Sequence, residues 1–347
     1  MRISVDLGFG YAKVVSESGK HESFPSVALR KTSSDKVKGF GLLGVEKDDY
    51  SIVMWNTGKP EESSSYYIGD LAMTSGGIRT WEEKVVRNIN TIPIIMTACA
   101  IVGNGDIDLS VGLPMTLEEE EFEEQKSEIK ELLKNKDFTL NIINYGTKKI
   151  KIRSVFVFQQ GTGAYYAACL NINGEIKDLK LLNSPCGLID PGQKTTDYLV
   201  MAKGKKGIAP RRDLSGGLDN MGMNVVYEQV KSYASKQAGK EVDMFKIEQA
   251  ILWNDCKFVF RGKEINLSSA YEEACKLLAN QIASTIKAKW GNEIDYLSKI
   301  LIAGGGGEVL FNYLKEHFPN AEKMSTYSNA EGYLAFQALI MKNRRTR

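Results

Sequence analysis

The sequence predicts an α/β protein of two related domains that close on one ligand, and three observations support this. Residues 3–15 and 188–200 each read as an apolar strand ending at an aspartate, a glycine-containing turn and a returning strand. The chain has 347 residues, which is too long for one small core, so two domains of roughly 150 to 200 residues are expected. Its composition, 43% hydrophobic and 25% charged, is that of an ordinary globular protein.

The first hairpin turns at Gly8, Phe9 and Gly10, and Lys13 falls on its returning strand. A tight turn directs successive amide N–H groups into one concavity, which binds anions. Lys13 is close enough to the turn to reach a phosphate, and the alternative for this residue is a solvated strand position. We therefore interpret the first hairpin as a phosphate-binding turn.

The rest of the first half combines strands and helices. We expect a small subdomain of about residues 20–95, inserted into the first domain and rich in Gly and Ser. Residues 82–102 predict a long helix or a helical pair, interrupted near Pro93. A buried strand at 108–114 precedes an acidic helix at 118–133, whose first glutamates read as a solvated face favoured by the helix macrodipole. A strand at 150–158 then delivers Gln160 to the start of a helix at 164–170, which aims this amide into a cleft.

The second hairpin, at 188–200, repeats the first, and its Asp190 can hold a hydrated divalent ion on the same phosphates. We place the domain change near residue 170, so that 1–169 with 330–347 form domain I and 170–329 form domain II. A buried strand at 299–303 runs into four glycines, 304–307, whose backbone can approach a flat ligand closely. Domain II also carries a subdomain at about 235–270, and helices are expected at 221–234, 244–252, 268–290, 308–317 and 330–341.

Charge, cysteines and motif spacing argue against several classes of protein. The net charge of +2 gives no case for bulk electrostatic binding of nucleic acid. Five scattered cysteines and two histidines disfavour a zinc site or a disulfide framework and fit reduced thiols in the cytoplasm. No signal peptide is visible, and the most apolar window, 92–102, is too short to span a bilayer. The near match to a P-loop at 187–195 has one residue too many, Gln193, and continues as a strand.

The order of these motifs resembles the actin superfamily, which includes actins, the seventy-kilodalton heat-shock chaperones and sugar kinases. This implies an actin-like (ribonuclease H-like) fold with a nucleotide cleft between two domains. Within the superfamily the chain is most similar to the bacterial actin-like plasmid-partition proteins, the ParM/Alp family. The residues that carry the resemblance lie at 6–13, 111–114, 160–164, 190–197, 302–308 and 329–333.

The resemblance implies a role for each site residue. Gln160 would orient the attacking water, with Asp6 and Asp190 completing the catalytic set, while Mg²⁺ is organised mostly through water by Asp6, Asp190 and Asp197. The nucleotide is ATP, with GTP left open. Its phosphates and adenosine would be bound by Gly8, Phe9, Gly10, Lys13, Gly192, Gln193, Lys194, Thr195, Gly304, Gly305 and Gly306.

The second turn departs from the family, which usually has glycines where this chain has Gln193 and Lys194. These two residues would be strained if the turn required a positive φ at either position. Lys194 would either add a cation at the phosphates or turn to solvent.

The function that the resemblance implies is an ATPase that forms filaments by head-to-tail self-association. Such a filament would segregate plasmid DNA through a ParR-like DNA-binding adaptor on centromere DNA, in the cytoplasm, without contacting a membrane or reading DNA itself. The alternative is a small-molecule kinase of the same fold. A kinase would need a carboxylate base where this chain offers the amides of Gln159 and Gln160.

Overall fold

The computed structural model describes residues 1–31, 50–77, 79, 90–115, 118–205 and 207–345. These residues form two compact units, Met1–Leu179 with Tyr327–Arg347, and Lys180–Thr326. The sequence places the corresponding boundaries near 170 and 330. The turn after residue 169 belongs to unit 1 because Leu170 bridges to Ile176 and the Lys177 amide donates to the Cys169 carbonyl at 2.9 Å.

Unit 1 is built on a mixed sheet of nine strands in the order β3-β2-β1-β7-β9-β8-β5-β6-β4. The central strands β1, β7 and β9 are parallel, and the others join by antiparallel pairing. The strands are β1 Arg2–Leu7, β2 Tyr11–Ser16, β3 His21–Pro25, β4 Ala28–Arg30, β5 Tyr50–Asn56, β6 Ser64–Ile68, β7 Gly105–Leu113, β8 Asp137–Ile142 and β9 Gly146–Gln159.

The insertion expected at about 20–95 extends this sheet, and it also has a small buried cluster of its own formed by Val27, Tyr67, Leu71 and Ala72. Its strands β5, β6 and β4 reach β9 through β8, a strand that the sequence reading missed. Ile52 and Ile68 of the insertion belong to the same buried cluster as Ile3 and Leu109 of the central strands. One hydrophobic core therefore supports both the first hairpin and the extension.

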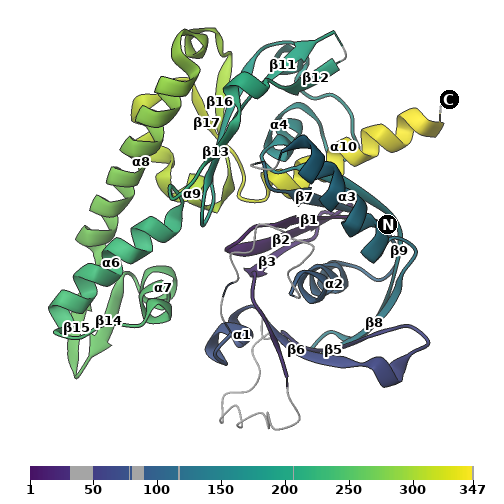
Figure 1. Cartoon of the computed structure of the whole chain (residues 1–347), viewed down its shortest axis with the longest axis horizontal. Coiled ribbons are helices and arrows are strands. Elements are labelled where there is room, and N and C mark those ends of the chain that lie inside the picture. The colour runs from purple at the N-terminus through teal and green to yellow at the C-terminus, as the bar shows by residue number, and fades with distance from the viewer. Residues whose placement is uncertain (32–49, 78, 80–89, 116–117, 206, 346–347) are drawn as a thin grey trace. The chain divides into compact units, whose positions relative to one another are not determined.

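The helices of unit 1 are α1 Asp70–Thr74, α2 Thr91–Val102, α3 Glu119–Leu133, α4 Thr162–Cys169 and α10 Ser328–Arg345. The curved sheet wraps around α2, which contacts β1, β2, β3, β5, β6, β8 and β9, while α10 lies against β1, β2 and β7 (Figure 1). Pro93 occupies the first turn of α2, where its missing N–H breaks no bond, so it does not interrupt the helix. Residues 82–89 of the predicted helix lie outside the described residues.

Unit 2 contains a second mixed sheet, in the order β12-β11-β10-β16-β17, with β13 paired to β11. A separate hairpin, β14–β15, accompanies α7 in the predicted subdomain. The elements are α5 Leu179–Leu182, which begins at the last residue of unit 1, β10 Cys186–Pro191, β11 Thr196–Gly204, β12 Gly207–Pro210, β13 Gly216–Leu218, α6 Met223–Ala238, α7 Met244–Trp253, β14 Lys257–Phe260, β15 Lys263–Asn266, α8 Ser268–Trp290, β16 Lys299–Ile302, α9 Gly304–His317 and β17 Ala321–Lys323.

The glycine run differs from its prediction. The sequence reading places 304–307 between a strand and a helix that begins at 308, but all four glycines form the first turn of α9. The second hairpin is confirmed as two antiparallel strands, so the near match to a P-loop has the wrong local fold. Across the described part of the chain, no helix combines the length and the hydropathy needed to cross a bilayer.

Candidate functional site: two matching hairpins

The hairpins of the two units have the same backbone arrangement. In β1–β2 the Gly8 amide donates to the Tyr11 carbonyl at 3.2 Å, and in β10–β11 the Gly192 amide donates to the Thr195 carbonyl at 2.8 Å. A Cβ atom added at either glycine would lie 3.0 Å from that same carbonyl oxygen. Neither glycine has a positive φ. A side chain at either position would therefore crowd the turn in the same way, and the sequence similarity reflects a shared geometry.

In unit 2 the start of α6 fixes the turn from one side. The carbonyls of Gly192 and Gln193 accept from the amides of Met223 at 3.0 Å and Asn224 at 2.9 Å. Because a trans peptide holds its C=O and the next N–H in opposite directions, the amides of Gln193 and Lys194 point away from α6. Consecutive amides that face one side of a turn form a nest for an anion.

Close packing of α6 on the turn depends on Gly222. A Cβ at this residue would lie 2.5 Å from the Gln193 carbonyl oxygen. The turn itself is relaxed, because neither Gln193 nor Lys194 has a positive φ. The strain that these two residues would suffer in a glycine-requiring turn is absent.

In unit 1 a single serine occupies the equivalent position. The Ser26 hydroxyl donates to the Gly8 carbonyl at 2.6 Å, and the Ser26 amide donates to the Gly10 carbonyl at 2.9 Å. Sequence reasoning missed Ser26, because a serine between two short strands carries no pattern of its own. The need for a hydrogen-bond donor to the carbonyls of the first turn is the signal that could have identified Ser26.

Gln160 lies against the same turn. It follows β9, where its amide N–H donates to the Leu113 carbonyl at 2.7 Å, and its side-chain Nε2 donates to the Leu7 carbonyl at 3.1 Å. This bond fixes the side chain and directs Oε1 to act as an acceptor. Gly112 provides the space, because a Cβ there would lie 3.1 Å from Cγ of Gln160. The predicted delivery of Gln160 by a strand thus brings it to the first hairpin.

Two motifs that the sequence reading treated separately hold the helix after Gln160. The Asn329 side chain accepts from the Ala164 amide at 3.1 Å, at the start of α4. A Cβ on Gly332 of α10 would overlap the Gly163 carbonyl, so the two helices touch through their main chains. Residues 160–164 and 329–333 therefore form one packed support for Gln160.

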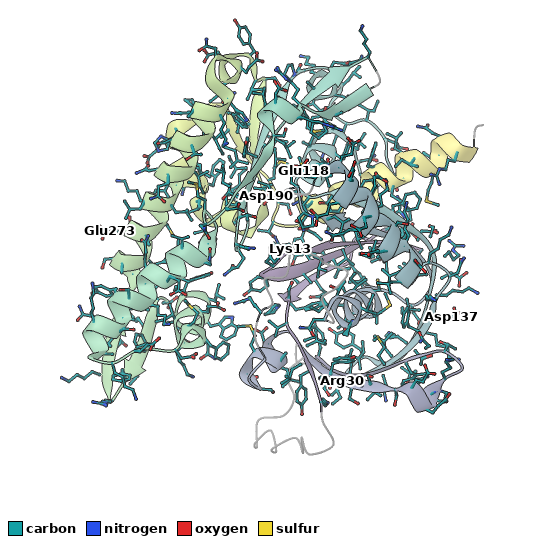
Figure 2. All side chains as sticks on the ribbon, viewed as in Figure 1. Lys13, Arg30, Glu118, Asp137, Asp190 and Glu273 are labelled. Carbon is teal, nitrogen blue, oxygen red and sulfur yellow. The ribbon has the colours of Figure 1, made fainter. Side chains whose placement is uncertain are left out.

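The residues opposite the two aspartates differ in charge. Asp6, which is buried, lies opposite Lys13 in the first hairpin, whereas Asp190 lies opposite Asp197 in the second. Figure 2 labels Lys13 and Asp190. Directly opposite residues of an antiparallel pair project from the same face, so two carboxylates share one face in unit 2. Such a pair is stabilised by a cation. Among the described residues no group of three or more His, Cys, Asp or Glu side chains could hold a metal ion directly.

The glycines of α9 pack mainly against the second hairpin. A Cβ on Gly304, whose φ is +77°, would overlap Oδ1 of Asp190, and one on Gly306 would lie 2.5 Å from the Pro191 carbonyl oxygen. The Asp190 carboxylate consequently lies at the positive end of the α9 dipole. Gly305 is exposed, whereas Gly304 and Gly306 are buried. The expected contact of these glycines with adenosine stays a prediction. Of the three, Gly305 is the residue exposed enough to make such a contact.

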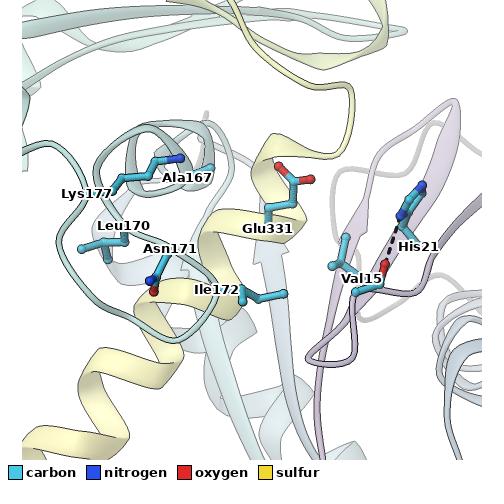
Figure 3. Close-up of a pocket in the computed structure, with 9 residues that line it drawn as sticks. Val15, His21, Ala167, Leu170, Asn171, Ile172, Lys177 and Glu331 are labelled. Carbon is cyan, nitrogen blue, oxygen red and sulfur yellow. Dashed lines mark hydrogen bonds between the residues drawn. The ribbon is translucent and has the colours of Figure 1, made fainter.

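A separate pocket of about 230 Å³ lies in unit 1 (Figure 3). Val15, Leu170 and Ile172 give it apolar walls, and Glu331 and His21 project from α10 and β3. Burial raises the pKa of the Glu331 carboxyl, while Lys177 and His21 oppose this rise electrostatically. The pocket shares none of the residues predicted to bind nucleotide.

Comparison with known proteins agrees with this arrangement. Residues 4–163 match the family described as the N-terminal domain of actin-like proteins, and residues 188–316 match that described as archaeal actin homologue MreB-like, C-terminal. An archaeal actin homolog from Thermoplasma acidophilum is 22% identical over 345 residues, covering 95% of this chain and 97% of the relative.

Two solved structures have the same fold along nearly the whole chain. A ParM filament from Clostridium botulinum is 24% identical, with a TM-score of 0.76 and coverage of 96% of this chain and 98% of that one. An archaeal actin homolog in complex with ADP is 21% identical, with a TM-score of 0.74 and coverage of 97% and 98%.

The two mixed sheets and their matching hairpins define an actin-like α/β fold, and the predicted fold class is confirmed. The chain is similar to actin-like proteins over residues 4–163 and 188–316, and to ParM and archaeal actin homologs along nearly its whole length.

Proposed function

We propose that the chain binds ATP through both hairpins and hydrolyses it in the course of forming filaments. The observation that carries this proposal is that both units close the same turn with the same amide-to-carbonyl bond. In both units the carbonyl of the first glycine in the turn accepts a hydrogen bond, from Ser26 in unit 1 and from α6 in unit 2. The amide that follows this carbonyl therefore points away from Ser26 or from α6. The archaeal homolog solved with ADP supports an adenine nucleotide as ligand.

Asp190 and Asp197 would hold Mg²⁺, with Asp6 as a further, buried carboxylate. The facing carboxylates of unit 2 suit a hydrated divalent ion, because Mg²⁺ retains several waters and takes few protein ligands. When bound, Mg²⁺ neutralises charge on the phosphates. Lys13 and Lys194 would add positive charge, and Gly8, Phe9, Gly10 and 192–195 would supply the close backbone.

Gln160 is the residue proposed to position the attacking water. Its Nε2 is engaged by the Leu7 carbonyl, so Oε1 can accept a hydrogen bond from a water molecule beside the turn. Hydrolysis of this class depends on positioning and on neutralising charge, with little covalent chemistry from the protein. Gly304, Gly305 and Gly306 would lie near the adenosine.

Filament formation is supported by the relationship to a ParM that has been solved as a filament. A head-to-tail contact that does not close produces an open polymer. We propose that this polymer acts in the cytoplasm and segregates plasmid DNA through a ParR-like DNA-binding adaptor bound to centromere DNA. The net charge of +2 fits a filament that leaves DNA binding to its adaptor.

Light scattering and sedimentation with and without Mg-ATP test this function, with GTP, ADP and EDTA as comparison conditions. We expect a polymer that requires nucleotide and Mg²⁺ and that disassembles as phosphate is released. Absence of any polymer well above micromolar concentration, with turnover stimulated by a sugar or another hydroxyl compound, would instead identify a small-molecule kinase.

A further inference from the structure

We propose that Ser26 is a positioning residue for nucleotide binding, because its hydroxyl keeps the first turn in its anion-binding orientation. This inference rests on the proposed function. It adds a residue outside both hairpins, with no charge and no direct contact with the ligand.

Ser26 acts on the peptide between Gly8 and Phe9. The Ser26 hydroxyl donates to the Gly8 carbonyl at 2.6 Å. Since C=O and the following N–H of a trans peptide are opposed, this bond turns the Phe9 amide to the side away from Ser26. An amide in that direction attracts phosphate oxygens, whereas a carbonyl in the same place repels them.

Without the hydroxyl, the Gly8 carbonyl loses this hydrogen bond, and the peptide can rotate more readily. Gly8 has no side chain, so its backbone can adopt conformations that other residues avoid. The Gly10 carbonyl is held by the Ser26 main-chain amide at 2.9 Å, which remains in any substitution except proline. Removing the hydroxyl therefore releases one peptide and leaves the rest of the turn attached.

The backbone around Ser26 is itself held by hydrogen bonds and burial. It lies between β3 and β4, and the next residue, Val27, is fully buried. The Val27 amide donates to the Pro25 carbonyl at 2.7 Å, and its carbonyl accepts from the Gly69 amide at 2.9 Å. Loss of one hydroxyl is consequently expected to leave this backbone in place.

In unit 2 the Met223 amide of α6 donates to the Gly192 carbonyl, which is equivalent to the Gly8 carbonyl of unit 1. There the support is main chain and cannot be removed by a side-chain substitution. In unit 1 the same task falls to one hydroxyl group. A substitution of Ser26 can thus change anion binding by the first turn without changing any residue of the turn itself.

The test measures dissociation constants of the full chain for Mg-ATP, Mg-ADP and adenosine. Ser26→Ala is expected to weaken both nucleotides roughly 10-fold, the equivalent of one hydrogen bond, and to leave adenosine unchanged because adenosine has no phosphate. Ser26→Thr keeps the hydroxyl and should remain within about threefold of the wild type. Ser298→Ala is the matched control, because that hydroxyl donates to the Pro185 carbonyl at 2.8 Å, away from the turn.

Thermal unfolding without nucleotide distinguishes positioning from folding. If Ser26→Ala does not fold, Ser26→Cys, with a weaker donor, should still show reduced nucleotide affinity with normal adenosine binding. Equal affinity of Ser26→Ala and the wild type for Mg-ATP overturns the inference, as does an equal loss of ATP and adenosine binding. A wild type that binds no nucleotide overturns the proposed function itself and the inference with it.

Discussion

The two hairpins have the same turn but different supports. In unit 1 side chains provide two of the three bonds: the Ser26 hydroxyl holds the Gly8 carbonyl and Gln160 donates to the Leu7 carbonyl, while the Ser26 amide holds the Gly10 carbonyl. In unit 2 main chain provides the support: the first amides of α6 hold two carbonyls, and the glycines of α9 pack against Asp190 and Pro191. The comparison teaches that a phosphate-binding turn needs its carbonyls fixed, whichever atoms fix them.

The hairpins also differ in charge. Asp6 faces Lys13 in the first, and Asp190 faces Asp197 in the second. The first hairpin places a carboxylate opposite an ammonium group, whereas the second places two carboxylates opposite each other, a pair that a bound cation would stabilise. We therefore expect side-chain substitutions to affect hydrolysis through unit 1 and metal dependence through unit 2.

Gln160→Ala should produce the largest effect, a hydrolysis rate roughly 100-fold lower, because it removes the side chain proposed to orient the water. Nucleotide affinity should change by less than about threefold, and filaments should form and persist longer. Phosphate release and sedimentation measure the two quantities, with Gln159→Ala as the neighbouring control. An equal loss of assembly and hydrolysis would argue against this role.

Gly304→Ala should destabilise unit 2 by about 2 kcal/mol, roughly 30-fold in the folding equilibrium, because the residue has a positive φ and its new Cβ would overlap Asp190. Gly305→Ala, at an exposed position of the same helical turn, should change stability by less than about 0.5 kcal/mol. Urea unfolding of both variants compares them. Similar values would mean that α9 does not depend on close packing at Asp190.

Asp197→Lys gives the second hairpin the charge pattern of the first. Replacing one of the two facing carboxylates should stabilise the nucleotide-free protein by about 0.5 kcal/mol. It should also reduce, roughly 10-fold, the factor by which Mg²⁺ increases nucleotide affinity. Titration calorimetry with Mg²⁺ and with EDTA measures the enhancement. Asp295→Lys, an exposed control with the same charge change, should retain it. Full retention by Asp197→Lys would remove this residue from the metal site.

Glu331→Gln tests the support of the first hairpin and should have the smallest effect. Because burial raises the pKa of Glu331 above its ordinary value of 4.5, the folded state binds this proton more tightly than the unfolded state. Stability from this group is therefore present at low pH and is lost as pH rises through the raised pKa. The variant should be more stable than the wild type at pH 8, by less than about 1 kcal/mol since the carboxyl is only half-buried, and the gain should vanish near pH 4.

Urea unfolding across this pH range measures the difference, and Glu61→Gln, at an exposed position, is the control. A pH-independent difference between Glu331→Gln and the wild type would show that the effect comes from packing and not from the charge.

The sequence predicted well what is encoded locally. Both hairpins and the helix at 268–290 follow from residue patterns and turn residues, and the structure has them at those positions. Ser26 and β8 could not be predicted in the same way, because their roles depend on pairing with distant segments. The glycines of α9 were interpreted as an open loop, whereas their requirement is the close approach of Asp190 and Pro191. Patterns report periodicity along the chain, and such contacts are not periodic.

The contact between Gly163 of α4 and Gly332 of α10 has a mechanical consequence. Most helix pairs are separated by side chains, whose rotamers can absorb a small displacement. Here main chain meets main chain, so few side-chain rotamers are available to absorb a displacement of α10 relative to α4. We therefore expect a displacement of α10 to be felt at α4, which begins two residues after Gln160.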